Sequence, residues 1–189
     1  MTKLVETAEA IETVTPESAA AEPEPADPII TIRPMTAEDY PEVFALWEHI
    51  AGFRLRSIDD SEEGVTRFLR RNPTTSVVAV ATHPDAEDPT AEKIVGSILC
   101  GHDGRQGALY HVCVMRDYRK HGIGRRMVAA AMRALNEEHI SKCTLVAFSD
   151  NKVGNAFWEG IGWTPRPDFN CYEFLLNPEN ITRFVDNED

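Results

Sequence analysis

Residues 107 to 138 constrain the fold more than any other part of the sequence, because a strand pattern, a basic loop and a helix pattern follow one another directly. The apolar run Gly107–Met115 (GALYHVCVM), bounded by turn residues, predicts a strand. From about residue 122 to 138, apolar side chains recur at helical spacing on one face. A strand that leads straight into an amphipathic helix is typical of α/β proteins. We therefore expect an α/β domain.

The loop between this strand and this helix has the chemistry of an anion site. Five basic residues surround a single acidic one in it: Arg116, Arg119, Lys120, Arg125 and Arg126 around Asp117. Backbone N–H groups at a helix N-terminus lack intrahelical acceptors, and the helix dipole adds positive potential. Gly122 and Gly124 carry no Cβ atom that would keep a large anion away from those groups. The sequence predicts an anion of pyrophosphate size here.

The remaining elements complete a mixed order of strands and helices. Thr36, with Asp39 three residues later, predicts a helix N-cap, and Asp103-Gly104 predicts a hairpin turn. We expect strands over 29–32, 76–82, 93–100, 107–115, 142–148, 163–164 and 172–176, and helices from Thr36, over 59–71, 122–138 and 151–160. Antiparallel hairpins alternate here with β-α-β crossovers, so a doubly wound dinucleotide fold is excluded. A Walker P-loop is also excluded, because no Gly-Lys-Ser/Thr follows the glycines.

Charge divides the chain into a tail and a domain. The formal net charge is −12, and residues 1–28 carry half of it, with seven acidic residues and one lysine. This segment is rich in Ala, Glu, Pro and Thr, and we expect it to be a disordered acidic tail. The folded domain is expected over residues 29–177, followed by an acidic, frayed tail over 178–189. An acidic protein repels phosphate, so we expect no nucleic-acid partner.

Cysteine usage and hydropathy predict where the protein works. The four cysteines lie far apart without metal-ligand spacing, which predicts neither a disulfide nor a metal. Three of them lie inside apolar stretches, which suits small buried side chains in a reducing compartment. No apolar run reaches 18 residues and the first residues lack a secretory pattern. We expect a cytoplasmic protein without a membrane partner.

Two motifs in this order resemble the GNAT superfamily of N-acetyltransferases. The first is the family's Gln/Arg-x-x-Gly-x-Gly/Ala loop, matched by Arg119, Gly122 and Gly124, with Val114 at the expected spacing before it. The second is similar to the family's Asn-x6-Tyr-x3-Gly-Phe helix and runs from Asn151 to Trp163. The resemblance implies the GNAT acyl-CoA N-acyltransferase fold, a central, mostly antiparallel sheet with one splayed parallel strand pair, flanked by helices.

The same resemblance implies acetyl-CoA as co-substrate, with no metal. Its pantetheine arm would enter between the strands 107–115 and 142–148, and loop N–H groups would hold its pyrophosphate. A substrate amine would then attack the thioester directly in a ternary complex. The residues implied in binding acetyl-CoA are Val112, Val114, Arg119, Lys120, His121, Gly122, Ile123, Gly124, Arg125 and Asn151.

Three residues are candidates for proton transfer. Trp158 stands where the family usually carries the tyrosine that protonates the departing thiolate. An indole N–H donates a hydrogen bond but does not release its proton near neutral pH. Solvent, another tyrosine or a changed substrate geometry would then have to replace it, and Trp158 would pack. For the base, Tyr110 and His111 are strand neighbours expected to point to opposite faces, and we expect Tyr110, ahead of His111, to face the cleft.

The acceptor remains open between three alternatives. The negative charge outside the loop favours acetylation of a small cationic amine. Acetylation of a protein N-terminus or lysine, as in ribosomal-protein acetyltransferases of the superfamily, is the second, and a non-catalytic acyl-CoA-binding regulatory module is the third. The resemblance also implies a homodimer as an alternative to a monomer, since many relatives pair through terminal strands.

Overall fold

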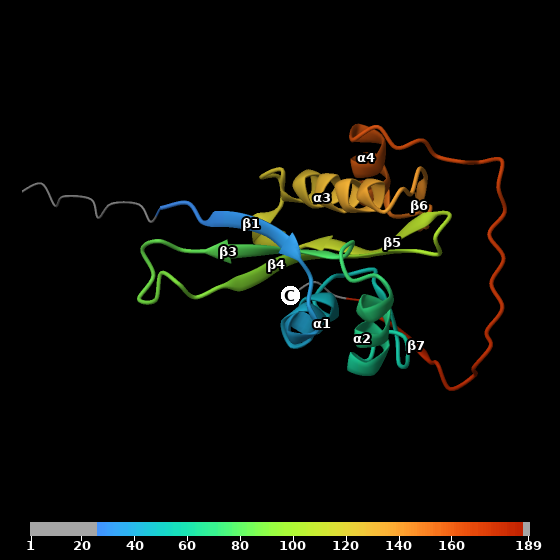
Figure 1. Ribbon diagram of the computed structural model, residues 1–189, viewed down its shortest axis with the longest axis horizontal. Coiled ribbons are helices and arrows are strands. Elements are labelled where there is room, and N and C mark those ends of the chain that lie inside the picture. The colour runs from blue at the N-terminus through green and yellow to red at the C-terminus, as the bar shows by residue number, and fades with distance from the viewer. Residues whose placement is uncertain (1–25, 187–189) are drawn as a thin grey trace, which may run out of the picture.

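The computed structural model describes residues 26–186 and is organised around one five-stranded sheet (Figure 1). Its strands are β1 (Ile29–Pro34), β3 (Val77–Thr82), β4 (Lys93–His102), β5 (Gly107–Val114) and β6 (Cys143–Leu145), in the spatial order β1-β3-β4-β5-β6. The first four strands pair antiparallel and β6 pairs parallel to β5. The expected mixed sheet with one parallel pair is confirmed.

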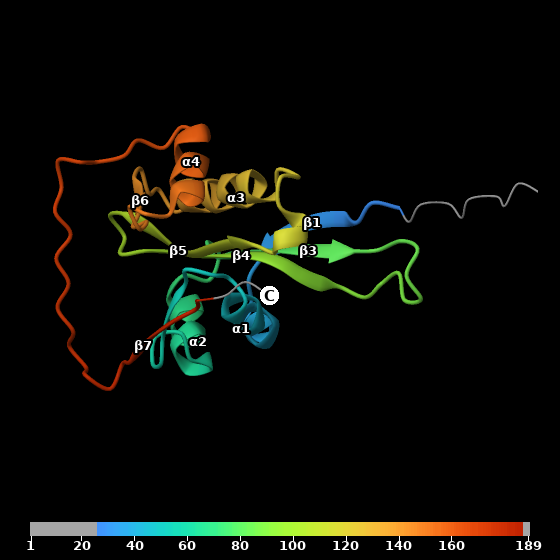
Figure 2. The same cartoon turned by 180° about the vertical axis from the view of Figure 1, so that it is seen from behind.

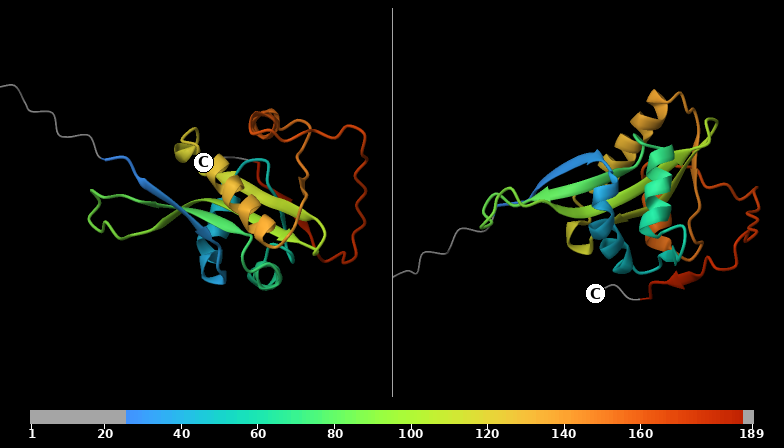
Figure 3. Two further views of the ribbon diagram at one scale, coloured as in Figure 1. Left: turned by 45° about the horizontal axis from the view of Figure 1, so that its top comes forward. Right: turned by 60° about the horizontal axis from the view of Figure 1, so that its bottom comes forward.

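Helices cover both faces of the sheet. On one face lie α3 (Ile123–Glu137) and α4 (Lys152–Gly160), and on the other lie α1 (Tyr40–Glu48) and α2 (Glu62–Arg71), as Figures 1 and 2 show from opposite sides. The right-hand view of Figure 3 shows α1 and α2 lying next to each other. Two 3₁₀ turns, Ala37–Asp39 and Arg116–Tyr118, precede α1 and α3.

Two hydrophobic clusters separate the sheet from these helices. Against α1 and α2, the fully buried Trp47 and Val43 pack with Val78 and Val80 of β3. Against α3, the fully buried Met127 packs with a second set of strand side chains. Side chains of β3 therefore contribute to both clusters, because successive residues of a strand point to opposite faces of the sheet.

The corner between β1 and α1 follows from the predicted N-cap. The carboxylate of Asp39 accepts a hydrogen bond from the backbone N–H of Thr36 at 2.8 Å and two more from the guanidinium of Arg33, both at 2.8 Å. Pro41 stands in the first turn of α1, where a missing N–H costs nothing. The predicted capping pair is thus present and also ties the helix to the first strand.

The C-terminal part of the chain differs from expectation. Residues 163–164 and 172–176, expected as closing strands, form no strand, and the chain from α4 runs in a wide arc (Figures 1 and 2). A β-prone segment becomes a strand only when a neighbour accepts its backbone hydrogen bonds. The expectation of a frayed end from residue 178 onward is wrong for β7 (Thr182–Phe184), which pairs antiparallel with β2 (Arg54–Arg56), and for the buried Val185.

Several other expectations concern the chain as a whole. The acidic tail expected over residues 1–28 lies outside the described residues, apart from its last three. All four cysteines are free; burial raises the pKa of the Cys100 thiol to about 12 and that of Cys113 to about 11, in keeping with buried apolar roles. None of the described helices is both long enough and apolar enough to cross a bilayer.

Candidate active site

The candidate site is defined by the part of β5 that has no partner on the β6 side. β5 pairs with β6 only from Gly107 to Leu109, opposite Cys143–Leu145, where β6 ends, and β5 continues to Val114. Val112 and Val114 lie on the free part of β5, partly buried, with side chains against the α3 layer. The edge of β5 that faces away from β4 therefore carries main-chain groups without a strand partner.

The predicted anion loop follows this unpaired part of β5 in the chain. Lys120 and Gly122 both adopt left-handed backbone, with φ of +67° and +74°, and Gly122 is the N-cap of α3. A Cβ atom on Gly122 would meet no other atom within 4 Å, so the loop is open where an anion would approach. Ile123 is buried and anchors the first turn, whose N–H groups have no intrahelical acceptor.

Two arginines of the loop donate hydrogen bonds to main-chain carbonyl groups, while two other side chains are exposed. Arg119 donates from Nε to the carbonyl oxygen of Val114 at 2.9 Å, and Arg125 donates to the carbonyl oxygen of Gly160 at 3.3 Å. Lys120 and His121 are exposed. Gly124 serves packing as well, because a Cβ atom there would lie 3.3 Å from the ring of Phe157. The predicted reason for glycine, room for an anion, therefore fits position 122, while position 124 lets α3 approach α4.

The second motif forms the N-terminus and the core face of α4. Asn151 is its N-cap, with Oδ1 accepting from the N–H of Gly154 at 2.9 Å. Trp158 is partly buried, and its ring lies 5.0 Å from those of Phe157 and Trp163. These contacts are those of a capping residue and of a packed aromatic residue, respectively.

A β-bulge decides where Tyr110 and His111 point. Leu99 is opposite Tyr110 while Ser97 is opposite Cys113, so two residues of β5 face Ile98 alone. His111 takes φ of +47° at this point. The expectation that Tyr110 and His111 point to opposite faces is wrong, because the bulge breaks the alternation. Tyr110 packs edge-on against Phe68 of α2, and His111 lies against α1 on the same face.

The two residues differ in their surroundings. Tyr110 is 52% exposed. His111 is largely enclosed, with its ring 4.5 Å from that of Trp47 and 5.2 Å from that of Phe53. Its Nε2 lies 2.7 Å from a carboxylate oxygen of Asp60, a residue of the turn between β2 and α2. Asp60 is 51 positions away in sequence, and no spacing or motif indicated this pairing.

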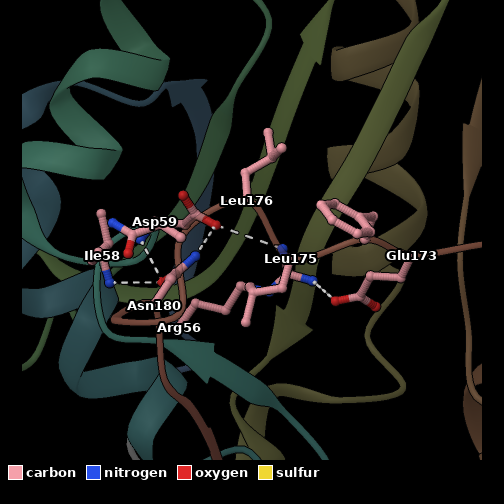
Figure 4. A pocket seen from close by; sticks show the side chains of 9 residues that line it. Arg56, Ile58, Asp59, Glu173, Leu175, Leu176 and Asn180 are labelled. Atoms are coloured by element: carbon pink, nitrogen blue, oxygen red, sulfur yellow. Dashed lines mark hydrogen bonds and ion pairs between the residues drawn. The ribbon is translucent and has the colours of Figure 1, made fainter.

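A pocket of about 260 Å³ adjoins this turn (Figure 4). Arg56 and Asp59 line one wall, and Glu173 lines the other, 3.1 Å from a guanidinium nitrogen of Arg56. Asn180 ties the walls together: its Oδ1 accepts from the N–H of Ile58 at 2.9 Å and its Nδ2 donates to Asp59 at 2.8 Å. The C-terminal segment thus forms part of the pocket.

One arginine joins β2 and β7 to the segment that follows β6. The guanidinium of Arg54, on β2, lies over the ring of Phe148, which follows β6, at 3.9 Å from its centre. The same group lies 4.9 Å from the centre of the Phe184 ring on β7. One arginine therefore holds three segments that are distant in sequence, each contact contributing roughly 0.5–1 kcal/mol at an exposed position.

Comparison with known proteins shows that this chain is similar to acetyltransferases. The model of the acetyltransferase (GNAT) family matches residues 16–163. An acetyltransferase of Sodalis glossinidius is 31% identical over 130 residues, 69% of this chain and 84% of the relative. Among solved structures, an aminoglycoside N-acetyltransferase in complex with CoA has a TM-score of 0.57 at 13% identity, covering 79% of this chain and 97% of its own.

A second solved structure, the NatC complex bound to Gag peptide and CoA, has a TM-score of 0.55 at 21% identity and covers 70% of this chain and 81% of its own. At these sequence identities, the solved structures support the fold alone. The family model spans well over half of the chain and agrees with the curated relative. The chain therefore belongs to the GNAT acetyltransferase family and is an acyltransferase enzyme.

Proposed function

We propose that this enzyme transfers the acetyl group of acetyl-CoA directly to the primary amine of a small cationic acceptor in a ternary complex. The observation that carries the proposal is the part of β5 beyond Leu109 that has no β6 partner and leads to the open N-terminus of α3. Main-chain groups of β5 beyond Leu109 would hold the pantetheine arm, and N–H groups of residues 120–124 would hold the pyrophosphate. The solved structures of this fold that contain CoA support the choice of donor.

The acceptor would enter from the face of α1 and α2. The 260 Å³ pocket suits a small molecule, and its three charged side chains, Arg56, Asp59 and Glu173, carry one net negative charge. Asp60 adds a fourth charged group next to His111. In this arrangement His111, more enclosed than Tyr110, would take the proton of the substrate ammonium, because imidazole is the side chain best suited to proton transfer near neutral pH.

A second candidate acceptor is the amine of a peptide. Residues 169–176 lie extended and include exposed apolar side chains, with Tyr172 at 88% exposure. An extended chain with free backbone groups can pair with another extended chain. The NatC structure, which contains a peptide, gives this alternative its fold-level parallel.

A thiol-release screen decides between the acceptors. Purified protein and acetyl-CoA would be offered polyamines, aminoglycosides, amino acids and N-terminal peptides. Turnover of a polyamine or aminoglycoside in preference to peptides is expected. Selective turnover of peptides would replace the small-amine proposal with the second one.

The donor site is tested by Gly122→Glu. The new carboxylate and the strain at φ +74° should lower acetyl-CoA affinity by about 100-fold or more in calorimetry, because like charge meets the pyrophosphate. Gly104→Glu is the matched control: its φ is +85° and its Cβ position is equally open, but it lies in the β4–β5 turn. Equal affinity in both variants would exclude the loop as the pyrophosphate site.

A further inference from the structure

We propose that Asp60 is a positioning residue that makes His111 the proton acceptor of this enzyme; the inference rests on the proposed transfer to an amine. Asp60 and His111 come from separate layers and meet at 2.7 Å between Oδ1 and Nε2. Their side chains are 8% and 15% exposed. A carboxylate that accepts from one ring nitrogen fixes the other nitrogen as the one with the lone pair.

The carboxylate is itself held in place. Its second oxygen, Oδ2, accepts from the backbone N–H of Arg56 at 2.6 Å, and the N–H of Asp60 donates to the carbonyl of Arg56 at 3.0 Å. The hydroxyl of Tyr40, on α1, donates to the carbonyl oxygen of Asp60 at 3.0 Å. Three hydrogen bonds from two elements therefore orient Asp60 before any substrate binds, which is the arrangement that proton transfer needs.

The imidazole ring is equally constrained. Trp47 packs against it and is anchored by a hydrogen bond from Nε1 to Ser97 Oγ at 2.8 Å. Phe53 covers another side of the ring. The left-handed backbone of His111 at the bulge is uncommon outside glycine and concentrates at functional sites. Ring orientation is thus fixed by packing as well as by Asp60.

The second ring nitrogen of His111 is available. Within residues 26–186, Nδ1 has no hydrogen-bond partner. No buried side-chain nitrogen or oxygen of these residues lacks a partner, so Nδ1 must reach accessible space. With the Nε2 hydrogen directed at Asp60, Nδ1 is the atom that can accept a proton from the substrate.

Few other titratable groups face the ring. Asp60 is the charged side chain in contact with it, while Trp47 and Phe53 are neutral. Behind the ring, the thiol of Cys113 lies 3.4 Å from Ser97 Oγ, and burial raises its pKa to about 11, so it stays neutral. Burial likewise raises the pKa of Tyr40, whose hydroxyl faces the backbone of Asp60.

The proton balance of the step is complete with these groups. The substrate ammonium gives one proton to His111 Nδ1, and the imidazolium is stabilised by Asp60. The free amine forms a C–N bond with the acetyl carbon, the C–S bond breaks, and the thiolate leaves with the electron pair. The nitrogen then passes its second proton to the thiolate, which gives the free thiol of CoA. His111 releases the first proton to solvent and returns to its neutral form.

Kinetics of matched variants test the role. His111→Gln and Asp60→Asn should each lower kcat/KM for the amine by about 100-fold, with acetyl-CoA affinity unchanged. The double variant should be no worse than His111→Gln alone, because the two residues act as a unit. Glu63→Gln, which removes an exposed acid three positions away, should retain wild-type kcat/KM. Wild-type kcat/KM and an unchanged pH profile in Asp60→Asn would overturn the inference.

Nitrogen-15 NMR of the imidazole gives a readout without substrate. The wild type should show the tautomer with the proton on Nε2, and Asp60→Asn should change this. A wild type with the proton on Nδ1 would overturn the positioning role. Failure of the proposed function has a different signature: the wild type would release no thiol with any amine, or would not bind acetyl-CoA, while the tautomer remained as stated. Because the contacts of Asp60 with Arg56 and Tyr40 do not involve His111, the His111→Gln variant keeps them. It therefore serves as the control for a folding defect in Asp60→Asn.

Discussion

At the scale of single residues, the candidate site combines a local feature with a long-range contact. The left-handed N-cap Gly122 was predictable, because it depends on local conformation at a helix start. The contact of Asp60 with His111 was not predictable, because it spans 51 positions. The bulge that turns His111 also lacks a local signal, since residues 107–115 form an unbroken apolar pattern. Sequence patterns indicate local conformation, whereas contacts between layers depend on the fold as a whole.

Trp158 allows a test of packing against chemistry. Trp158→Phe keeps an aromatic ring next to Phe157 and Trp163 and removes the indole N–H. If Trp158 only packs, kcat should stay within about three-fold of the wild type, since general acid catalysis contributes about 100-fold or more. Trp163→Phe controls for loss of ring area. A fall of about 100-fold in Trp158→Phe alone would mean that the indole takes part in the reaction.

At the scale of elements, the long strands and helices were predicted within a few residues of their observed ends. These elements carry periodicity that a sequence displays. β2 and β7 were missed, because each has three residues and their pairing joins positions about 130 apart. Residues 172–176 have strand composition and no strand partner in the described chain, so composition alone misled.

The β1–α1 corner makes stability depend on pH. Burial opposes the ionisation of Asp39, but hydrogen bonds from Arg33 and Thr36 outweigh it and lower the pKa of the carboxyl group. A lowered pKa stabilises the fold above about pH 4, and this contribution disappears as the pH falls through the folded-state value. Asp39→Asn should cost about 1–3 kcal/mol of unfolding free energy at pH 7.

Urea unfolding at several pH values checks this expectation. The difference between the wild type and Asp39→Asn should shrink as the pH falls below about 4, where the wild-type carboxyl becomes protonated. Glu87→Gln, which changes an exposed acid in the loop between β3 and β4, should leave the urea midpoint nearly unchanged. A difference that does not vary with pH would contradict the ionic origin.

At the scale of the whole molecule, the C-terminal segment packs next to the proposed acceptor side. Gly52 donates to the carbonyl of Val185 at 2.8 Å, and Val185 donates to the carbonyl of Phe53 at 3.0 Å. Because Phe53 packs against His111, the hydrogen bonds of Val185 help to hold the surroundings of His111 in place. A domain boundary at residue 177, expected from sequence, would leave this support out.

Truncation tests whether stability and activity depend on the C-terminal segment. A chain that ends at residue 177 loses β7, Asn180 and the buried Val185. Burial of one such side chain stabilises by about 1.5–3 kcal/mol, so the melting temperature should fall by roughly 5 °C or more. Thiol release should fall with it. An unaltered melting temperature after the longer truncation would show that β7 contributes nothing.

In the proposed function, main-chain groups of the unpaired part of β5 hold the acyl donor, and this has an evolutionary consequence. Main-chain contacts require few particular amino acids, so this half of the proposed site can persist while the sequence changes extensively. The opposite half consists of side chains from residues 53–60 and 173–180, and each substitution there alters what fits. Proteins with under a third of their residues in common would then keep the same acyl donor and diverge in the molecules they modify.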